Sequence, residues 1–211
     1  MILAVDTAGP WVCVAWGDAT GVGAGIRREA SFNHNEILPE TCAQLLASAP
    51  GAPKALAVNV GPGSFTGTRV GVAFVAGLGQ ALGLRVWPVS SFVVAASLAS
   101  PSAHRVRVAV PLVRDVWGAC RLSRVDGDWR EESWHEQAQT ELLRSDDDPL
   151  VCPWGECGAA VTAPSDWNPA VVLVNLAALA PVQVFEAPHR LAVRYLGKCQ
   201  AERVFEARHG A

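Results

Sequence analysis

The sequence has little charge and no excess of basic side chains. Of its 211 residues, 18% are charged, and 17 lysines and arginines against 20 aspartates and glutamates give a formal net charge of -3 at pH 7. Proteins that grip nucleic acid by themselves neutralise many phosphates with basic side chains, so this composition excludes a broad nucleic-acid-binding surface. Half of the residues are apolar, which is enough to bury the core of one large domain or of two small lobes.

The chain also lacks a long uncharged apolar run at its start. The first apolar stretch, residues 1–6, ends at the acidic Asp6. A membrane-spanning helix needs about 20 apolar residues, and a signal peptide has an uncharged apolar centre. This stretch therefore predicts a strand, and we expect a cytoplasmic protein without a membrane segment.

Cysteine and histidine do not occur at the spacings of a metal site. Most of the six cysteines stand in apolar runs such as residues 11–16, where a thiol packs as a small hydrophobic group. The closest pair, Cys152 and Cys157, has four residues between its members, and no pair of cysteines or histidines follows at zinc-ligand spacing. We expect neither a disulfide framework nor a structural zinc ion.

The first hundred residues predict an α/β lobe. Apolar stretches between Gly, Pro and Asp turns predict strands, and apolar residues at helical spacing predict helices. The predicted strands are residues 2–6, 11–16, 23–30, 55–60 and 85–89, and the first three form an antiparallel meander. The predicted helices are one at about 38–49 with Pro39 in its first turn, one at 65–82 ended by Gly83, and one at 91–98.

A Ser-Pro-Ser-Ala stretch at residues 100–103 predicts a hinge, after which a similar order of elements begins again. The predicted strands are 106–112, 118–124, 129–134 and 150–152, and the predicted helices are 136–144 and 170–180. We therefore expect two α/β lobes, each a mixed sheet with helices. The N-terminal lobe is residues 1–100 and the smaller C-terminal lobe is 101–211, with the last helix or the tail able to pack back on the N-terminal lobe.

The most informative stretch is the Gly-rich loop within residues 58–71, which joins a predicted strand to a predicted helix. Backbone N–H groups at such a helix start, with Ser64 as the N-cap, can face an anion. The loop is not a Walker A motif because no Lys follows its last glycine, and Thr66 stands where a dinucleotide-binding motif has its third glycine. Pro62 stands where the nucleophile elbow of a hydrolase needs glycine. A tight turn without a ligand is the alternative interpretation.

Four segments of the chain have the form of family motifs. They are residues 2–8 (Ile-Leu-Ala-Val-Asp-Thr-Ala), 34–39 (His-Asn-Glu-Ile-Leu-Pro), 61–71 (Gly-Pro-Gly-Ser-Phe-Thr-Gly-Thr-Arg-Val-Gly) and 88–91 (Pro-Val-Ser-Ser). Together they resemble the TsaB (YeaZ) family, the non-catalytic subunit of the bacterial machinery that makes N6-threonylcarbamoyladenosine (t6A) in tRNA. Weaker likeness follows at 114–115 and 194–196. The resemblance implies the two-lobed actin-like, Hsp70-like and sugar-kinase-like (ASKHA) fold.

Enzymes of that fold clamp nucleotide phosphates with one acidic loop from each lobe. The resemblance places Asp6 and Thr7 in the first loop, whereas Arg114 and Asp115 stand where the second, Gly-rich loop is expected. The candidate vestigial phosphate site, for weak ATP or ADP binding, consists of Asp6, Thr7, Gly61, Gly63, Ser64 and Thr66. The alternative is that Asp6 accepts turn N–H groups in a purely structural role.

The histidines also differ from those of TsaD, the catalytic relative, which holds a metal through two histidines one helical turn apart. The five histidines here include no such pair, so we expect no metal ligands and no catalytic residues. His34 and Glu36 have the composition of a general base unit. A hydrogen bond at the start of the first helix is the alternative role for His34.

The helix at 65–82 suggests a partner surface. It is rich in glycine and apolar residues, and each glycine costs about 1 kcal/mol relative to alanine, which close approach to another helix would offset. Packing between the sheet and the first helix is the alternative reason. In TsaB proteins the first two helices pack on the same helices of TsaD, or of a second TsaB, as a four-helix bundle. The predicted contact residues are Leu38, Leu45, Val72, Phe74 and Val75.

The resemblance thus implies a scaffold or activating subunit that forms a heterodimer with TsaD. TsaE and tRNA would join only through that complex. Two other functions stay open: an independent nucleotide-dependent hydrolase or transferase that uses Asp6 and the Gly61 loop, and a stand-alone homodimeric binding module.

Overall fold

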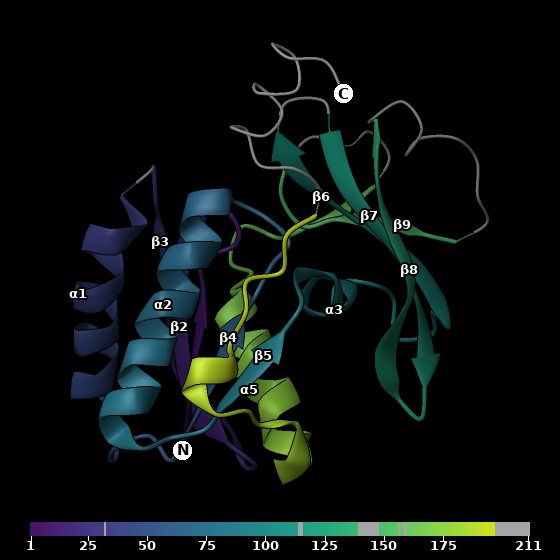
Figure 1. Cartoon of the computed structure of the whole chain (residues 1–211). Helices are drawn as coiled ribbons and strands as arrows, with labels where there is room; N and C mark the ends of the chain where they lie inside the picture. The colour runs from purple at the N-terminus through teal and green to yellow at the C-terminus, as the bar shows by residue number, and fades with distance from the viewer. Residues whose placement is uncertain (32, 114–115, 139–147, 156, 158–159, 197–211) are drawn as a thin grey trace.

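The computed structural model describes residues 1–31, 33–113, 116–138, 148–155, 157 and 160–196, and its core is two five-stranded mixed sheets (Figure 1). The first sheet has the strand order β3-β2-β1-β4-β5 and the second β10-β9-β6-β7-β8. In each sheet the first three strands along the chain are antiparallel, and the next strand pairs in parallel with the first of them. The predicted class, α/β with a mixed sheet in each of two lobes, is confirmed.

The first sheet contains the predicted meander and two parallel strands. Its strands are β1 (Ile2–Asp6), β2 (Trp11–Asp18), β3 (Gly21–Glu29), β4 (Ala55–Asn59) and β5 (Val86–Val89). Larger side chains such as Leu3, Val5 and Val14 point to one face, toward α1 (His34–Ala47) and α2 (Phe65–Leu82). The alternate residues are small, and this face is covered by α5 (Pro169–Leu179). The period of two along each strand therefore separates two unlike cores.

The helix predictions differ mainly at one boundary. Helix α2 spans the predicted residues, with the Ser64 side chain capping its start and Gly83 ending it at a φ of 66°, a left-handed conformation that glycine adopts without strain. Helix α1 begins at His34, four residues before the predicted start, so Pro39 lies inside it rather than in its first turn. The third predicted helix, α3, covers Ser91–Ala96.

The second sheet consists of β6 (Arg105–Val113), β7 (Val116–Val125), β8 (Asp128–Ala138), β9 (Leu150–Cys152) and β10 (Val161–Thr162). The helix predicted at 136–144 is wrong for residues 136–138, which continue β8 and pair with β7. The ladder of a long hairpin outweighs the helical propensity of this polar segment. The rest of that predicted helix, residues 139–144, lies outside the described residues.

Two segments join the lobes. Helix α3 lies between them, because Phe92, Ala95 and Ala96 pack with β6, β7 and β9. After α5 the chain forms two short 3-10 helices, η1 (Val182–Val184) and η2 (Pro188–Arg190). The segment beyond η2, yellow in Figure 1, then passes beside α2 toward the second sheet. Within the described part of the chain, no helix combines the length and apolarity needed to span a membrane.

Candidate functional site

Asp6, the last residue of β1, stands in a buried polar network that joins β1, β4 and the start of α3. Its side chain is 2% exposed. The Ala8 N–H donates to Oδ1 at 2.9 Å, and Asn59 Nδ2 donates to Oδ2 at 2.5 Å. The Asn59 Oδ1 in turn accepts hydrogen bonds from the Gly61 N–H and the Ser91 hydroxyl, both at 2.9 Å. Both carboxylate oxygens of Asp6 therefore have partners within the protein.

Burial sets the electrostatics of this carboxyl group. It raises the pKa of Asp6 from 3.8 to about 6, although the hydrogen bonds from Asn59 and Ala8 act in the opposite direction. The physical cause is the loss of hydration, which penalises the charged form more than these donors stabilise it. The turn N–H bond to Asp6 is the contact expected from the structural role, the alternative to phosphate binding.

The glycines of the loop fit against the turn that follows β1. A Cβ at Gly63 would lie 2.3 Å from the Ala8 carbonyl oxygen, and a Cβ at Gly67 would lie 2.3 Å from that of Thr7. The turn is bonded to the loop at the same places: the Ser64 N–H donates to the Ala8 carbonyl at 2.8 Å, and the Thr7 hydroxyl donates to the Gly67 carbonyl at 2.7 Å. Only residues without a side chain allow backbone to approach backbone so closely.

The partners of the loop N–H groups bear on whether the predicted phosphate-site residues are free to bind a phosphate. The N–H groups of Gly61, Ser64 and Gly67 donate to Asn59, to Ala8 and to the Ser64 hydroxyl. Thr66 is exposed at the start of α2. A phosphate cradle needs several free N–H groups that face one point, and these three N–H groups are already bonded within the protein. Binding of ATP or ADP stays a prediction.

His34 is buried beside this loop, and its ring nitrogens form no hydrogen bond with Glu36. Its Nε2 lies 3.4 Å from the Gly9 carbonyl oxygen, while Nδ1 has no hydrogen-bond partner. Burial lowers the pKa of His34, and the contact with Gly9 opposes this effect. Glu36 is exposed. The arrangement therefore lacks the base unit of two side chains, and His34 instead lies at the helix start against the turn.

The predicted partner residues lie on the inward side of α1 and α2. Leu38, Leu45, Val72 and Val75 are buried in the core of the first lobe, and Phe74 is half-buried against it. The four buried side chains are covered by the core, whereas Phe74 keeps part of its surface open, and the rest of the surface that these helices offer consists of other residues. On α2 these include Thr66, Arg69, Ala73, Gly77 and Gln80, all exposed. The sequence could not distinguish the two sides because small and apolar residues of this helix occur on both of them.

An aromatic–arginine cluster, consisting of Phe65, Arg69 and Tyr195, lies at the first turns of α2. Both rings are exposed, 42% for Phe65 and 43% for Tyr195, and their centroids are 5.4 Å apart. The Arg69 guanidinium lies 3.8 Å from the Phe65 ring centroid and 5.2 Å from that of Tyr195. Arg69 Nε also donates to the Tyr195 hydroxyl. The cation holds two exposed rings together at one end of the α2 surface.

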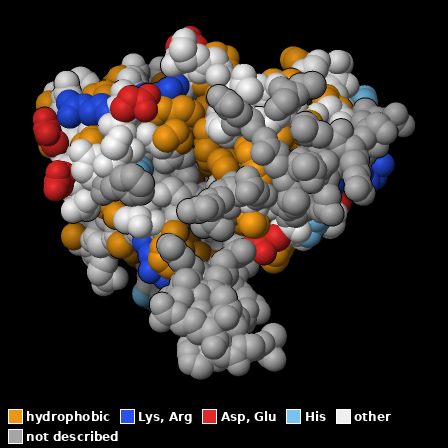
Figure 2. Space-filling model, turned by 90° about the horizontal axis from the view of Figure 1, so that it is seen from above, with side chains coloured by type: hydrophobic (Ala, Val, Ile, Leu, Met, Phe, Trp, Pro, Cys, Tyr) orange, Lys and Arg blue, Asp and Glu red, His pale blue; other side chains and the backbone are white. Residues whose placement is uncertain are grey.

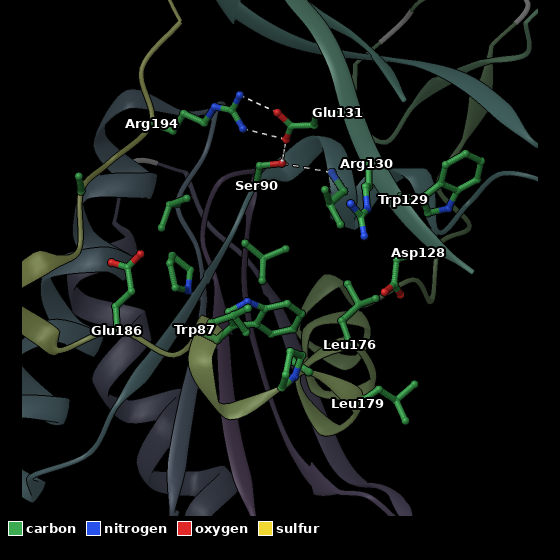
Figure 3. Close-up of a pocket in the computed structure, with 18 of the residues that line it drawn as sticks. Trp87, Ser90, Asp128, Trp129, Arg130, Glu131, Leu176, Leu179, Glu186 and Arg194 are labelled. Carbon is green, nitrogen blue, oxygen red and sulfur yellow. Dashed lines mark hydrogen bonds and ion pairs between the residues drawn. The ribbon is translucent and has the colours of Figure 1, made fainter. Parts of the chain in front are cut away.

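A groove of about 850 Å³ lies between the two lobes (Figure 3). One wall is the start of β8, residues 128–131, and the other consists of residues from β5, from the end of α5 and from the segment 184–194. Most of the lining is apolar and includes Trp87, Val89, Val93, Leu176 and Val193. The volume falls in the range of ligand pockets, about 300–1,000 Å³.

At the head of the groove a polar contact, here called the latch, joins the lobes. Arg194 and Glu131 face each other in Figure 3 and form a bidentate ion pair, with N–O distances of 2.8 and 2.6 Å. The Ser90 hydroxyl donates to the same carboxylate. The Arg194 guanidinium also lies 5.9 Å from the ring centroid of Phe92 and 5.5 Å from that of Trp134. No sequence signal predicted that Glu131 and Arg194 would meet.

The face shown in Figure 2 has no cluster of basic side chains, and the described residues contain no metal-binding group. The Lys and Arg side chains on the face shown in Figure 2 lie apart from one another. Among the described residues, no group of three or more His, Cys, Asp and Glu side chains could hold a metal ion. Cys152 and Cys157 are buried in one apolar cluster of the second lobe.

Comparison with known proteins gives a partial match in sequence. Residues 24–113 match the family model TsaD, described as tRNA N6-adenosine threonylcarbamoyltransferase. Uncharacterized proteins of Mycobacterium tuberculosis and Mycobacterium bovis are 36% identical over 95 residues, which cover 43% of this chain and 45% of those proteins. The match therefore spans less than half the length of these relatives.

The match in structure covers nearly the whole chain. YeaZ from Pseudomonas aeruginosa superposes with a TM-score of 0.76 at 23% identity, over 92% of this chain and 99% of that one. A protein described as uncharacterized, with similarity to the peptidase YEAZ of the same organism, gives a TM-score of 0.74 at 23% identity, over 93% and 99%. The chain thus has the fold of YeaZ, and the resemblance that its motifs predicted is confirmed at the level of the fold.

Proposed function

We propose that this protein is a non-catalytic scaffold or activating subunit in the formation of t6A in tRNA, and that it forms a heterodimer with a TsaD-type catalytic subunit. TsaE and tRNA join through that complex. The observation that carries the proposal is the match of residues 24–113 to the TsaD model. This region contains all of α1 and α2, the helices that the family resemblance assigns to the contact.

The exposed side of α2 has the shape that helix-to-helix docking needs. Ala73 and Gly77 lie one turn apart on this side, and a Cβ at Gly77 would meet no atom within 4 Å. Small residues let another helix approach closely, which offsets the stability that glycine costs within a helix. The aromatic–arginine cluster stands at the end of the same side, and Tyr and Arg are among the residues that most often anchor protein interfaces.

The contacts within the Gly-rich loop support a role without catalysis. Asp6 is bonded to Asn59 and Ala8 within the protein. Ser64 caps α2 with its hydroxyl and has no histidine hydrogen-bonded to it. A nucleophile would need an adjacent base, and a phosphate-binding carboxylate would need an open side.

The test is size-exclusion chromatography with light scattering on this protein alone and mixed with TsaD from the same organism, at micromolar concentration. We expect a new species at the summed mass of one copy of each. The Gly77→Arg variant should lose this species, because the long side chain blocks close approach. It should still fold, since arginine is a better helix former than glycine. Asn175→Arg adds the same side chain to the exposed side of α5 and should leave the complex intact.

Two outcomes would overturn the proposal. If the wild-type proteins elute separately at every salt and nucleotide condition, the heterodimer does not form, and an independent activity at Asp6 and the Gly61 loop becomes the question. If Gly77→Arg binds TsaD as the wild type does, the contact lies elsewhere. The same runs on the protein alone give its own mass and so separate the homodimer from the monomer.

A further inference from the structure

Residues 188–196, here called the strap, contact both lobes. In the first lobe, Pro188 packs on α2 at Gly79, where a Cβ would lie 2.9 Å from the proline ring. Leu191 and Val193 pack against the core formed by the first sheet and its two helices. In the second lobe, Leu196 is buried against Gly118 of β7, where a Cβ would lie 2.5 Å from the leucine side chain. One short segment therefore ties α2 to the second sheet.

The middle of the strap is fixed by its backbone. The Arg194 N–H donates to the Val60 carbonyl at 2.7 Å. A Cβ at Gly61 would lie 2.8 Å from the Arg194 carbonyl oxygen, and Gly61 has a φ of 98°. Glycine is thus required at this crossing both by the close approach and by the backbone conformation.

Two adjacent strap residues hold different parts of the protein. The Arg194 side chain forms the latch with Glu131 of the second lobe. The Tyr195 side chain, next in the chain, joins Phe65 and Arg69 on the exposed side of α2. The two side chains therefore leave the strap toward different elements, β8 and α2. Because the two residues are adjacent, a displacement of the Arg194 side chain by the second lobe can change the position of Tyr195 through a single peptide unit.

The latch lies at the groove between the two lobes. The groove lies between the start of β8 and the first lobe. The latch joins the two sides of this groove, beside the packing of Trp129 against the cluster that contains Phe92. The pair is partly covered, with side-chain exposures of 28% for Arg194 and 17% for Glu131. Contacts of this kind are directional and have two distinct states, formed and broken.

We propose that the strap couples the position of the second lobe to the aromatic–arginine cluster on α2: Glu131 holds Arg194, and Arg194 positions Tyr195. Movement of β8 away from the first lobe breaks the latch and releases Tyr195 from its place beside Phe65 and Arg69. By linkage, a contact that fixes Tyr195 also favours the closed latch. The consequence for a docked partner rests on the proposed function, whereas the coupling itself is a property of this chain alone.

The chain offers a direct probe, because Tyr195 is its single tyrosine. Fluorotyrosine incorporated in place of tyrosine gives one fluorine NMR signal, which reports the surroundings of that ring in the full chain without any partner. We expect Glu131→Gln to move this signal toward the position of an exposed tyrosine. We also expect amide hydrogen exchange at Arg194 to become about tenfold faster, since the bond to Val60 opens more often.

Glu132→Gln is the matched control. Glu132 is the next residue of β8 and pairs with Arg105 at 3.2 Å, away from the strap, so the same chemical change there should leave the Tyr195 signal unmoved. If Glu131→Gln does not fold, Arg194→Lys keeps the charge but loses the bidentate geometry, and should move the signal in the same direction. The coupling would be overturned if the Tyr195 signal did not move in a folded Glu131→Gln or Arg194→Lys variant, or if it moved equally in Glu132→Gln. Neither result bears on the heterodimer, so the proposed function would stand.

Discussion

The Asp6–Asn59 network and the Glu131–Arg194 latch both join segments that are far apart in the chain, but their surroundings differ. Asp6 and Asn59 are almost completely buried, and every bond in their network comes from short side chains or from the backbone. Glu131 and Arg194 are long side chains beside an open groove, and both keep some contact with solvent.

This difference in burial separates polar contacts that stabilise the fold from polar contacts that can open while the protein stays folded. A buried donor or acceptor that loses its partner has no water to replace it, so the Asp6–Asn59 network is maintained whenever the lobe is folded. A partly exposed pair can exchange its partner for water at a smaller cost. The first cluster is therefore suited to fixing a turn, and the second to opening and closing.

Asn59→Ala should be the most damaging change. It leaves the Asp6 carboxylate without one donor and removes the acceptor of both the Gly61 N–H and the Ser91 hydroxyl. We expect the unfolding free energy to fall by about 3–4 kcal/mol, measured by urea denaturation. A loss of less than about 1 kcal/mol would mean that water reaches the network, and the contrast with the latch would fail.

The charge on Asp6 should make stability depend on pH. Its pKa in the folded state is about 6, above the ordinary value of 3.8, so between these values the folded state binds more protons than the unfolded state. Stability therefore falls as the pH rises through this window, by at most about 3 kcal/mol, and the penalty is complete above pH 6.

The comparison of wild type with Asp6→Asn isolates this effect. Asparagine removes the titrating group but keeps an oxygen for the Ala8 N–H. His34 has a lowered pKa, so its contribution to stability is lost as the pH falls below its ordinary value, which is the opposite slope. That slope is common to both proteins and cancels in the difference. If the difference in unfolding free energy between wild type and Asp6→Asn is the same at pH 4 and at pH 7, the pKa of Asp6 is not raised in the folded protein.

Gly67→Ala and Gly77→Ala separate packing from helix propensity within one helix. The Cβ at position 67 would lie 2.3 Å from the Thr7 carbonyl oxygen, whereas the Cβ at position 77 would meet nothing. We expect the first change to lower the unfolding free energy by about 2 kcal/mol and the second to raise it by up to about 1 kcal/mol. If thermal denaturation shows the same change in stability for both variants, the turn after β1 can shift away from α2 without cost.

Local motifs allowed much of the first lobe to be predicted. The strand period, the cap at Ser64 and the stop at Gly83 depend on residues close in sequence, and all three are found in the structure. The direction in which α2 faces was not predictable, because small and apolar residues occur on every side of it. The side that carries Val72 and Val75 is chosen by the sheet and by α1, which lie elsewhere in the chain.

The site residues divide in the same way. The loop at Gly61–Ser64 was recognised from its glycines, but an anion site and a tight turn need the same residue types. The structure shows what the sequence could not, that the backbone of Ala8 and Thr7 lies directly against Gly63 and Gly67, as a tight turn requires. The latch was missed altogether, since 63 positions separate its two residues and the weak family likeness at residues 194–196 does not point to Glu131.

A smaller effect should come from Glu131→Gln, which weakens the latch but leaves an oxygen for Arg194. We expect the unfolding free energy to fall by about 1 kcal/mol, because solvent beside the groove can satisfy the freed guanidinium. Glu132→Gln, on the exposed side of the same strand, should change stability by less than about 0.5 kcal/mol. If Glu131→Gln costs as much as Asn59→Ala, the latch belongs to the cooperative core, and a contact that breaks only with the fold cannot transmit movement between the lobes.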